Sequence, residues 1–150
     1  MSISKINKIN HFNWQCKKTW IKSIKNTLWC LFGCSIGDFG TIFYFQINNY
    51  SWSTLLIMLL AIFNGLITSI ILETLILFKQ MSLKNAFHTA IGMSFISMLA
   101  MEITMNLTDL IIVGKAFLNL KIIPIMLLSG FLVSLPYNYW RLKKYNVSCH

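Results

Sequence analysis

The sequence predicts an all-α integral membrane protein, a bundle of four transmembrane helices with a basic interfacial N-terminal arm. The chain of 150 residues is 56% hydrophobic with a mean hydropathy of +0.64, which is too apolar for an ordinary soluble domain. Its apolar residues fall into four runs, each close to or above the roughly 20 residues that a helix needs to cross the hydrocarbon core. Most of the 13 basic residues lie outside these runs, whereas all four acidic residues lie inside them.

Residues 1–26 form the expected arm, which carries six lysines. A helix over its second half would be amphipathic, and such a segment lies in the membrane interface with its cations against anionic lipid headgroups. The apolar face would carry Cys16, Trp20 and Ile24, and the opposite face Lys18, Lys22 and Lys25.

The expected spans are residues 27–47, 54–78, 89–113 and 122–140, which together make one transmembrane domain over residues 27–140. The connections are short, so neighbouring helices should be antiparallel. Ser82 is a plausible N-cap for the third helix, which would begin before it enters the membrane. Residues 141–150 form a basic tail.

The distribution of basic residues predicts that both termini face the cytoplasm of a bacterial inner membrane, since cytoplasmic loops are enriched in Lys and Arg. The arm, the second loop and the tail hold eleven cations, while the first loop has none and the third has two. The cations are scattered over separate segments rather than gathered in one stripe, which argues against nucleic-acid binding. Outside the arm they are Lys79, Lys84, Arg141, Lys143 and Lys144 on one side, and Lys115 and Lys121 on the other.

At 100° per residue the third helix divides into two faces. One face should meet lipid, and the other should be buried against the first helix. The buried stripe contains Met98, Met101, Glu102, Met105 and Asp109, flanked by Ser94 and Asn106; the lipid face contains Leu99, Ile103, Leu107 and Leu110.

The first span divides in the same way. Gly33 and Gly37 form a G-x-x-x-G motif, and small residues of this kind let a neighbouring backbone approach closely. We expect the polar faces of the first and third helices to pack together. The polar arc holds Cys30, Cys34, Gly37, Asp38 and Thr41, and the opposite side Phe32, Ile36, Phe39 and Phe43.

The acidic residues are candidates for an intramembrane ion path. A carboxylate inside a bilayer costs on the order of 3 kcal/mol or more, and such residues usually face a bundle interior or a polar pathway. Two interpretations stay open: neutral carboxyls that only donate hydrogen bonds to packing partners, or carboxylates that hold a cation, hydronium or water. The candidate path comprises Asp38, Glu73, Glu102, Asp109 and Asn106.

The polar faces also carry soft ligands, because thiolates and thioethers suit Cu(I) and similar cations. Met as a flexible filler and Cys as a small hydrophobe are the structural alternative. The thiols are expected to be reduced, since no disulfide framework is apparent, and His11, His88 and His150 are expected to be interfacial rather than ligands. The candidate metal ligands are Cys30, Cys34, Met98, Met101 and Met105.

No enzyme is expected. Ser35–Asp38 lacks the first glycine of the Gly-x-Gly-Asp motif of intramembrane aspartyl proteases, and Cys30 and Cys34 do not form a Cys-x-x-Cys pair. A Ser–His–acid set, a phosphate-binding loop and a metalloprotease helix are also missing from the sequence.

Four segments resemble a bacterial integral membrane family known only as domain of unknown function 4396. The resemblance implies four membrane helices, but it carries no known reaction, substrate or site residue. The chain departs from the family pattern at Trp29, where a histidine is frequent, and at Asp38, where Glu is frequent; if that histidine binds metal in relatives, Trp29 weakens the metal interpretation. The segments are Cys30–Asp38, Ser82–Ala86, Met101–Ile103 with Asn106, and Pro136–Trp140.

The leading hypothesis is a non-enzymatic membrane protein that handles a cation, a proton or a soft metal through its polar interior. The competing class is a structural or accessory subunit whose polar helix faces only pack against copies of itself or a partner. Four short helices leave little room for a private pathway, so either role favours a homo-oligomer or a membrane partner.

Overall fold

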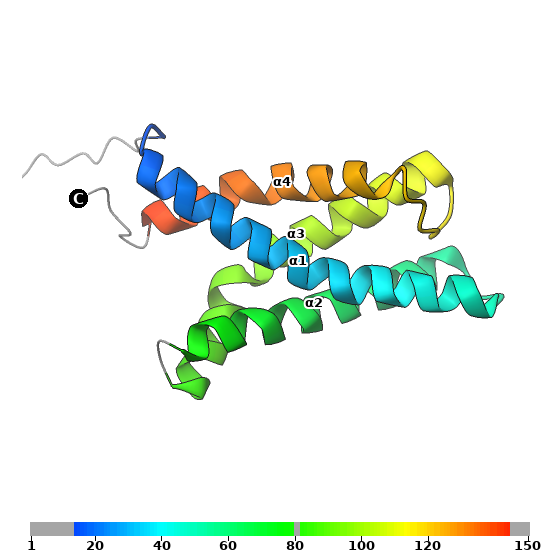
Figure 1. Ribbon diagram of the computed structural model, residues 1–150, viewed down its shortest axis with the longest axis horizontal. Helices are drawn as coiled ribbons and strands as arrows, with labels where there is room; N and C mark the ends of the chain where they lie inside the picture. Colours follow the sequence, from blue (N-terminus) through cyan, green and yellow to red (C-terminus); the bar gives the residue numbers. More distant parts are fainter. Residues whose placement is uncertain (1–13, 80–81, 145–150) are drawn as a thin grey trace, which may run out of the picture.

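The computed structural model describes residues 14–79 and 82–144, which fold into four helices that alternate in direction (Figure 1). Over these two stretches no strand occurs, so the all-α prediction is confirmed. The helices are α1 (Lys17–Asn48), α2 (Thr54–Phe78), α3 (Leu83–Val113) and α4 (Ile123–Lys144).

Three helical segments of the described chain are long and apolar enough to cross a membrane: Lys17–Asn48, Thr54–Phe78 and Ser94–Val113. The fourth helix, α4, is 22 residues long but carries basic residues in its last turn. A membrane protein is therefore supported by three helices, and the crossing by α4 stays a prediction.

Helix α1 begins at Lys17, so the last ten residues of the expected arm continue directly into the first span. Cys16 is buried as expected, but the rest of the buried side differs from the expected apolar face. Thr19 and Ser23 are buried, whereas Ile24 is exposed. The physical reason is that α4 packs here, and its close approach favours small side chains.

The packing of α4 on the start of α1 involves an aromatic cluster. The rings of Trp14 and Trp20 lie 5.0 and 4.3 Å from the ring of Tyr139. The Tyr139 hydroxyl also accepts a hydrogen bond from the Cys16 N–H at 3.3 Å. The start of α1 and the end of α4 therefore lie side by side (Figure 1).

The second half of α1 packs on α2 through its glycines. A Cβ added at Gly37 would lie 2.5 Å from the Asn64 carbonyl carbon, and one added at Gly33 would lie 2.8 Å from the Ser69 Cα. The expected contact of Gly37 and Thr41 with the third helix is therefore wrong, because the small residues of α1 admit the α2 backbone instead. We call this contact the α1–α2 seam.

Helix α1 thus changes partner along its length, from α4 to α2, and touches α3 only where the two cross (Figure 1). The outward faces are as expected: Phe32, Ile36, Ile103 and Leu107 are all exposed. Phe39 is an exception, because it is partly buried against the interior of the bundle.

The expected start of the third helix is confirmed, since Ser82 occupies the N-cap position of α3. Its side chain makes no capping hydrogen bond. The helix ends at Val113, and its C-cap residue is Gly114, whose φ of +78° is a left-handed conformation that glycine adopts without strain.

Candidate functional site

Six sulfur-containing side chains form one buried cluster where α1, α3 and α4 meet. All five expected soft ligands belong to it, and α4 adds Met126. On α1 and on α3 the spacing of three or four residues places these side chains on one face of the helix. We call this group the sulfur cluster: Cys30, Cys34, Met98, Met101, Met105 and Met126.

Close helix approach holds the sulfur cluster together. A Cβ at Gly130 of α4 would lie 2.7 Å from the Met105 Cγ, so the missing side chain of this glycine lets α4 approach these methionines closely. On the other side, the Ser69 hydroxyl of α2 donates to the Cys30 carbonyl at 3.2 Å and lies 3.7 Å from its Sγ. Cys30 and Cys34 are free thiols, as expected.

Glu102 lies beside the sulfur cluster and is fully buried. Its carboxyl group rests against the bare backbone of α2, since a Cβ at Gly65 would lie 2.6 Å from the Glu102 Cδ. Cys34 and Asp38 are its polar neighbours. Neither carboxyl oxygen makes a hydrogen bond to any residue of the described chain. A buried acid with no such partner is costly unless it is neutral or holds a cation.

Asp38 continues the line of polar groups away from the sulfur cluster. Its Oδ1 accepts a hydrogen bond from the Asn106 side-chain amide at 2.8 Å. The second side-chain oxygens of this pair, Asp38 Oδ2 and Asn106 Oδ1, are buried without hydrogen bonds inside the described chain. Asp38, Glu102 and Asn106 therefore bring several hydrogen-bond acceptor oxygens together, with few hydrogen-bond donors among these side chains.

Asp109 lies at the end of this line and has a structural task. Its Oδ2 accepts the Phe117 N–H at 3.0 Å and so ties α3 to the loop that precedes α4. The loop is also held by α1, because the Gln46 side-chain oxygen accepts the Leu118 N–H at 3.1 Å. Asp109 therefore lies on the expected ion path, and one of its two carboxyl oxygens is hydrogen-bonded to the loop.

Glu73 lies apart from the other acids, near the C-terminal end of α2. Its Oε1 accepts the Ser94 hydroxyl at 2.6 Å. The guanidinium of Arg141 is directed at the same hydroxyl at 3.4 Å and acts electrostatically on Glu73. The sequence interpretation placed Arg141 in a solvated tail, whereas it is buried in the last turn of α4.

The histidines add no ligand to the sulfur cluster within the described residues. His88 is exposed at the start of α3, and His11, His150 and Cys149 lie outside the described residues. Within residues 14–79 and 82–144 no three His, Cys, Asp or Glu side chains group as metal ligands. A metal in the sulfur cluster would therefore need thioether sulfur in addition to the two thiols.

Residues 19–146 match the protein family described as domain of unknown function DUF4396. The chain belongs to this family. The match confirms the resemblance seen in the sequence, and it includes α2, α3, α4, all of α1 except its first two residues, and every residue of the sulfur cluster. Comparisons with proteins of curated function and with solved structures give no match.

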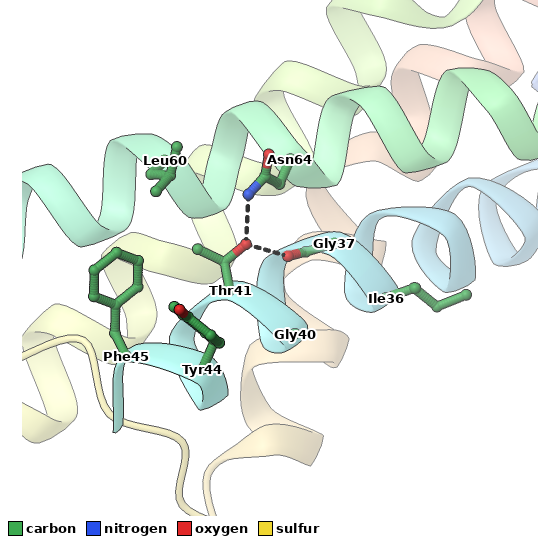
Figure 2. A pocket seen from close by; sticks show the side chains of 8 residues that line it. All are labelled: Ile36, Gly37, Gly40, Thr41, Tyr44, Phe45, Leu60 and Asn64. Atoms are coloured by element: carbon green, nitrogen blue, oxygen red, sulfur yellow. Dashed lines mark hydrogen bonds between the residues drawn. The ribbon is translucent and has the colours of Figure 1, made fainter. Parts of the chain in front are cut away.

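The structure of this DUF4396 member also reveals residues that sequence reasoning missed. The sequence did carry a signal for them, because the polar residues Asn64 and Thr68 interrupt the apolar run of α2. Asn64 donates to the Thr41 hydroxyl at 2.8 Å, and Thr41 donates to the Gly37 carbonyl at 2.7 Å. Figure 2 shows this chain of bonds beside an open hollow of about 460 Å³ on the α1–α2 surface. The Thr41 hydroxyl and the Asn64 amide in the wall of this hollow bond to each other. We therefore attribute the hollow to the packing of the α1–α2 seam and not to ligand binding.

Proposed function

We propose that this DUF4396 protein is a non-enzymatic membrane protein that binds a soft cation, Cu(I), in the sulfur cluster. The observation that carries the proposal is the gathering of six buried sulfurs from three helices beside the carboxyl group of Glu102, whose oxygens make no hydrogen bond to described residues. Two thiols and several thioethers form a ligand set that suits Cu(I).

Packing alone accounts for part of this arrangement. Methionine fills irregular gaps in apolar interiors, so the four methionines by themselves would fit a structural subunit. The acid beside them fits that alternative less well, because its polar neighbours are only Cys34 and Asp38 and neither of its oxygens makes a geometric hydrogen bond to a described residue. A bound cation would compensate both the thiolates and the carboxylate.

The carboxylates extend the proposal to a route for cations or protons. Glu102, Asp38 and Asp109 follow one another from the sulfur cluster toward the α3–α4 loop, with Asn106 between them. Intramembrane acids of this kind mark ion and proton pathways. Glu73 would be the acidic group of this route at the opposite end of the bundle.

The proposed orientation has four spans in a bacterial inner membrane and both termini in the cytoplasm. Eleven basic residues against two support it. Reporter fusions after Ser51 and Ala116 should be active in the periplasm, and fusions after Lys84 and at the C-terminus in the cytoplasm. A periplasmic C-terminus would overturn either the orientation or the count of four spans.

Cu(I) binding can be measured directly on the purified protein in detergent. Under anaerobic, reducing conditions, the protein should withdraw about one equivalent of Cu(I) from a chromophoric chelator. Cys34→Ser should weaken the affinity by at least about tenfold, since a hydroxyl is a poor ligand for a soft metal. Met98→Leu should weaken it by a smaller factor.

Met58→Leu is the matched control, because Met58 is a buried methionine of α2 outside the sulfur cluster. Its Cu(I) affinity should equal that of the wild type, and thermal melting should verify that every variant is folded. Equal affinities for the wild type and a folded Cys34→Ser variant would refute the proposal and favour the accessory-subunit alternative.

A further inference from the structure

A second hollow lies at the end of the bundle where α1 ends, α2 begins and α3 passes into the loop before α4 (Figure 1). Its volume is about 300 Å³, which is at the lower end of the range for pockets that hold small molecules. It shares no residue with the sulfur cluster and only Phe45 with the hollow on the α1–α2 seam. We call it the end pocket, and its wall consists of Phe45 and Gln46, residues 49–52, Thr54, Ile57 and residues 115–117.

Both sides of the end pocket are held in place. The α3–α4 loop is tied to Asp109 and Gln46 by the hydrogen bonds described above. On the other side, the buried ring of Phe45 lies 5.1 Å from the ring of Trp52 and 5.7 Å from that of Tyr50. The pocket is therefore formed by fixed elements, as ligand pockets usually are.

The charge of the end pocket favours an anion. Among the described residues that line it, Lys115 is the one charged side chain, and no acid accompanies it. The Lys115 Nζ lies 4.7 Å from the centre of the Phe117 ring, a distance at which a cation is attracted to the ring face. The ammonium group is thus held at the wall and exposed, where it can pair with a negative group.

The rest of the wall is half polar and half aromatic. The amide of Asn49 and the hydroxyls of Ser51 and Thr54 can donate and accept hydrogen bonds. Tyr50 and Trp52 are about half exposed, at 49% and 54%, and present ring surface. This combination suits an anion that also carries hydroxyl groups and a carbon skeleton.

The position of the end pocket points to a phospholipid as the source of such an anion. The three helices that are long and apolar enough to cross a membrane all have an end here, so the pocket lies at the level of the lipid headgroups, where Trp and Tyr are enriched. An ammonium headgroup would find no acid in the described wall to pair with. A headgroup of glycerol would instead match the hydroxyls and the amide.

We propose that the end pocket binds the headgroup of an anionic phospholipid, with one phosphodiester and a glycerol headgroup. Lys115 pairs with the phosphate, and Ser51 and Thr54 bond to the glycerol hydroxyls. Tyr50 and Trp52 pack on the glycerol carbons. This site lies at the opposite end of the bundle from the basic arm, and it goes beyond the proposed Cu(I) function without depending on it.

The test is the affinity of the purified full chain in detergent for phosphatidylglycerol, measured by native mass spectrometry. Lys115→Gln should weaken binding by about tenfold, because a charge-assisted hydrogen bond to the phosphate is lost, and Lys115→Arg should restore it. Lys121→Gln is the matched control, because it removes the same charge from the same loop outside the pocket; its affinity should stay within about twofold of the wild type. Thermal melting should verify that the variants are folded. Equal affinities for Lys115→Gln and Lys121→Gln would overturn the proposal.

Two other ligands test the chemistry of the headgroup on the wild-type protein. Phosphatidylethanolamine should bind about tenfold more weakly, since its ammonium would lie near Lys115, and equal binding of both lipids would refute the glycerol headgroup. The water-soluble glycerophosphoglycerol should displace the lipid only weakly, because it lacks the acyl chains that keep the lipid in the membrane. Displacement at concentrations equal to those of the lipid would instead show a site for a free phosphate ester and overturn the lipid assignment.

Discussion

The α1–α2 seam and the interior beside α3 are built from different chemistry. In the seam, Gly33 and Gly37 admit the α2 backbone, and each central hydroxyl or amide meets a partner, as Asn64 and Thr41 do at 2.8 Å. In the interior, flexible sulfur side chains surround Glu102, whose oxygens have no hydrogen bond to described residues.

The difference separates packing from function within one helix. Small residues and matched hydrogen bonds are what membrane helix association requires, so the seam is explained by assembly of the bundle. Partnerless buried acids reduce stability unless something compensates them. Since α1 contributes to both regions, substitutions on its two faces test whether the interior is also only packing.

The largest effect is expected at the seam. Gly37→Ala places a Cβ 2.5 Å from the Asn64 carbonyl carbon, and because this neighbour is backbone the helices must separate, at a cost of about 1–3 kcal/mol. Gly40→Ala is the matched control, because a Cβ at Gly40 meets nothing within 4 Å. Thermal melting in detergent should show a clear loss for Gly37→Ala alone, and equal melting temperatures would contradict the seam.

A smaller effect is expected where the two regions meet, at Gly65. A Cβ there overlaps the Glu102 carboxyl, which is the movable end of a side chain. Gly65→Ala should therefore destabilise the protein, and Glu102→Ala should relieve the overlap. A double-mutant cycle should give a coupling of about 0.5–3 kcal/mol. Strictly additive melting shifts would show that Glu102 does not rest against α2.

The sequence predicted most of the interior because helical periodicity alone assigns faces. Met98, Met105 and Cys34 all fall on the predicted buried side and are buried. It also predicted the start of α3 at Ser82, since an N-cap depends on local residues.

What the sequence did not predict is which helix each face meets. Gly37 was assigned to the third helix and packs on α2, because partner choice depends on the shape of the whole bundle. Met126 lies in an evenly apolar run, and Arg141 follows the fourth expected span, so neither carries a periodic signal. Both side chains reach the interior only because α4 packs against α1 and α3.

The smallest change in stability is expected for Glu102→Gln, which decides whether the interior is functional. The amide keeps the shape of the carboxyl group, and no hydrogen bond to described residues is lost, so melting should stay within about 0.5 kcal/mol of the wild type. Cu(I) affinity should fall by about tenfold, since a neutral amide no longer compensates the cation. Asp109→Asn is the control, because that acid bonds the Phe117 N–H at the far end of α3, and its Cu(I) affinity should not change. A Glu102→Gln variant that melts and binds Cu(I) like the wild type would make Glu102 a neutral packing residue, and the interior would then differ from the seam only in its side chains.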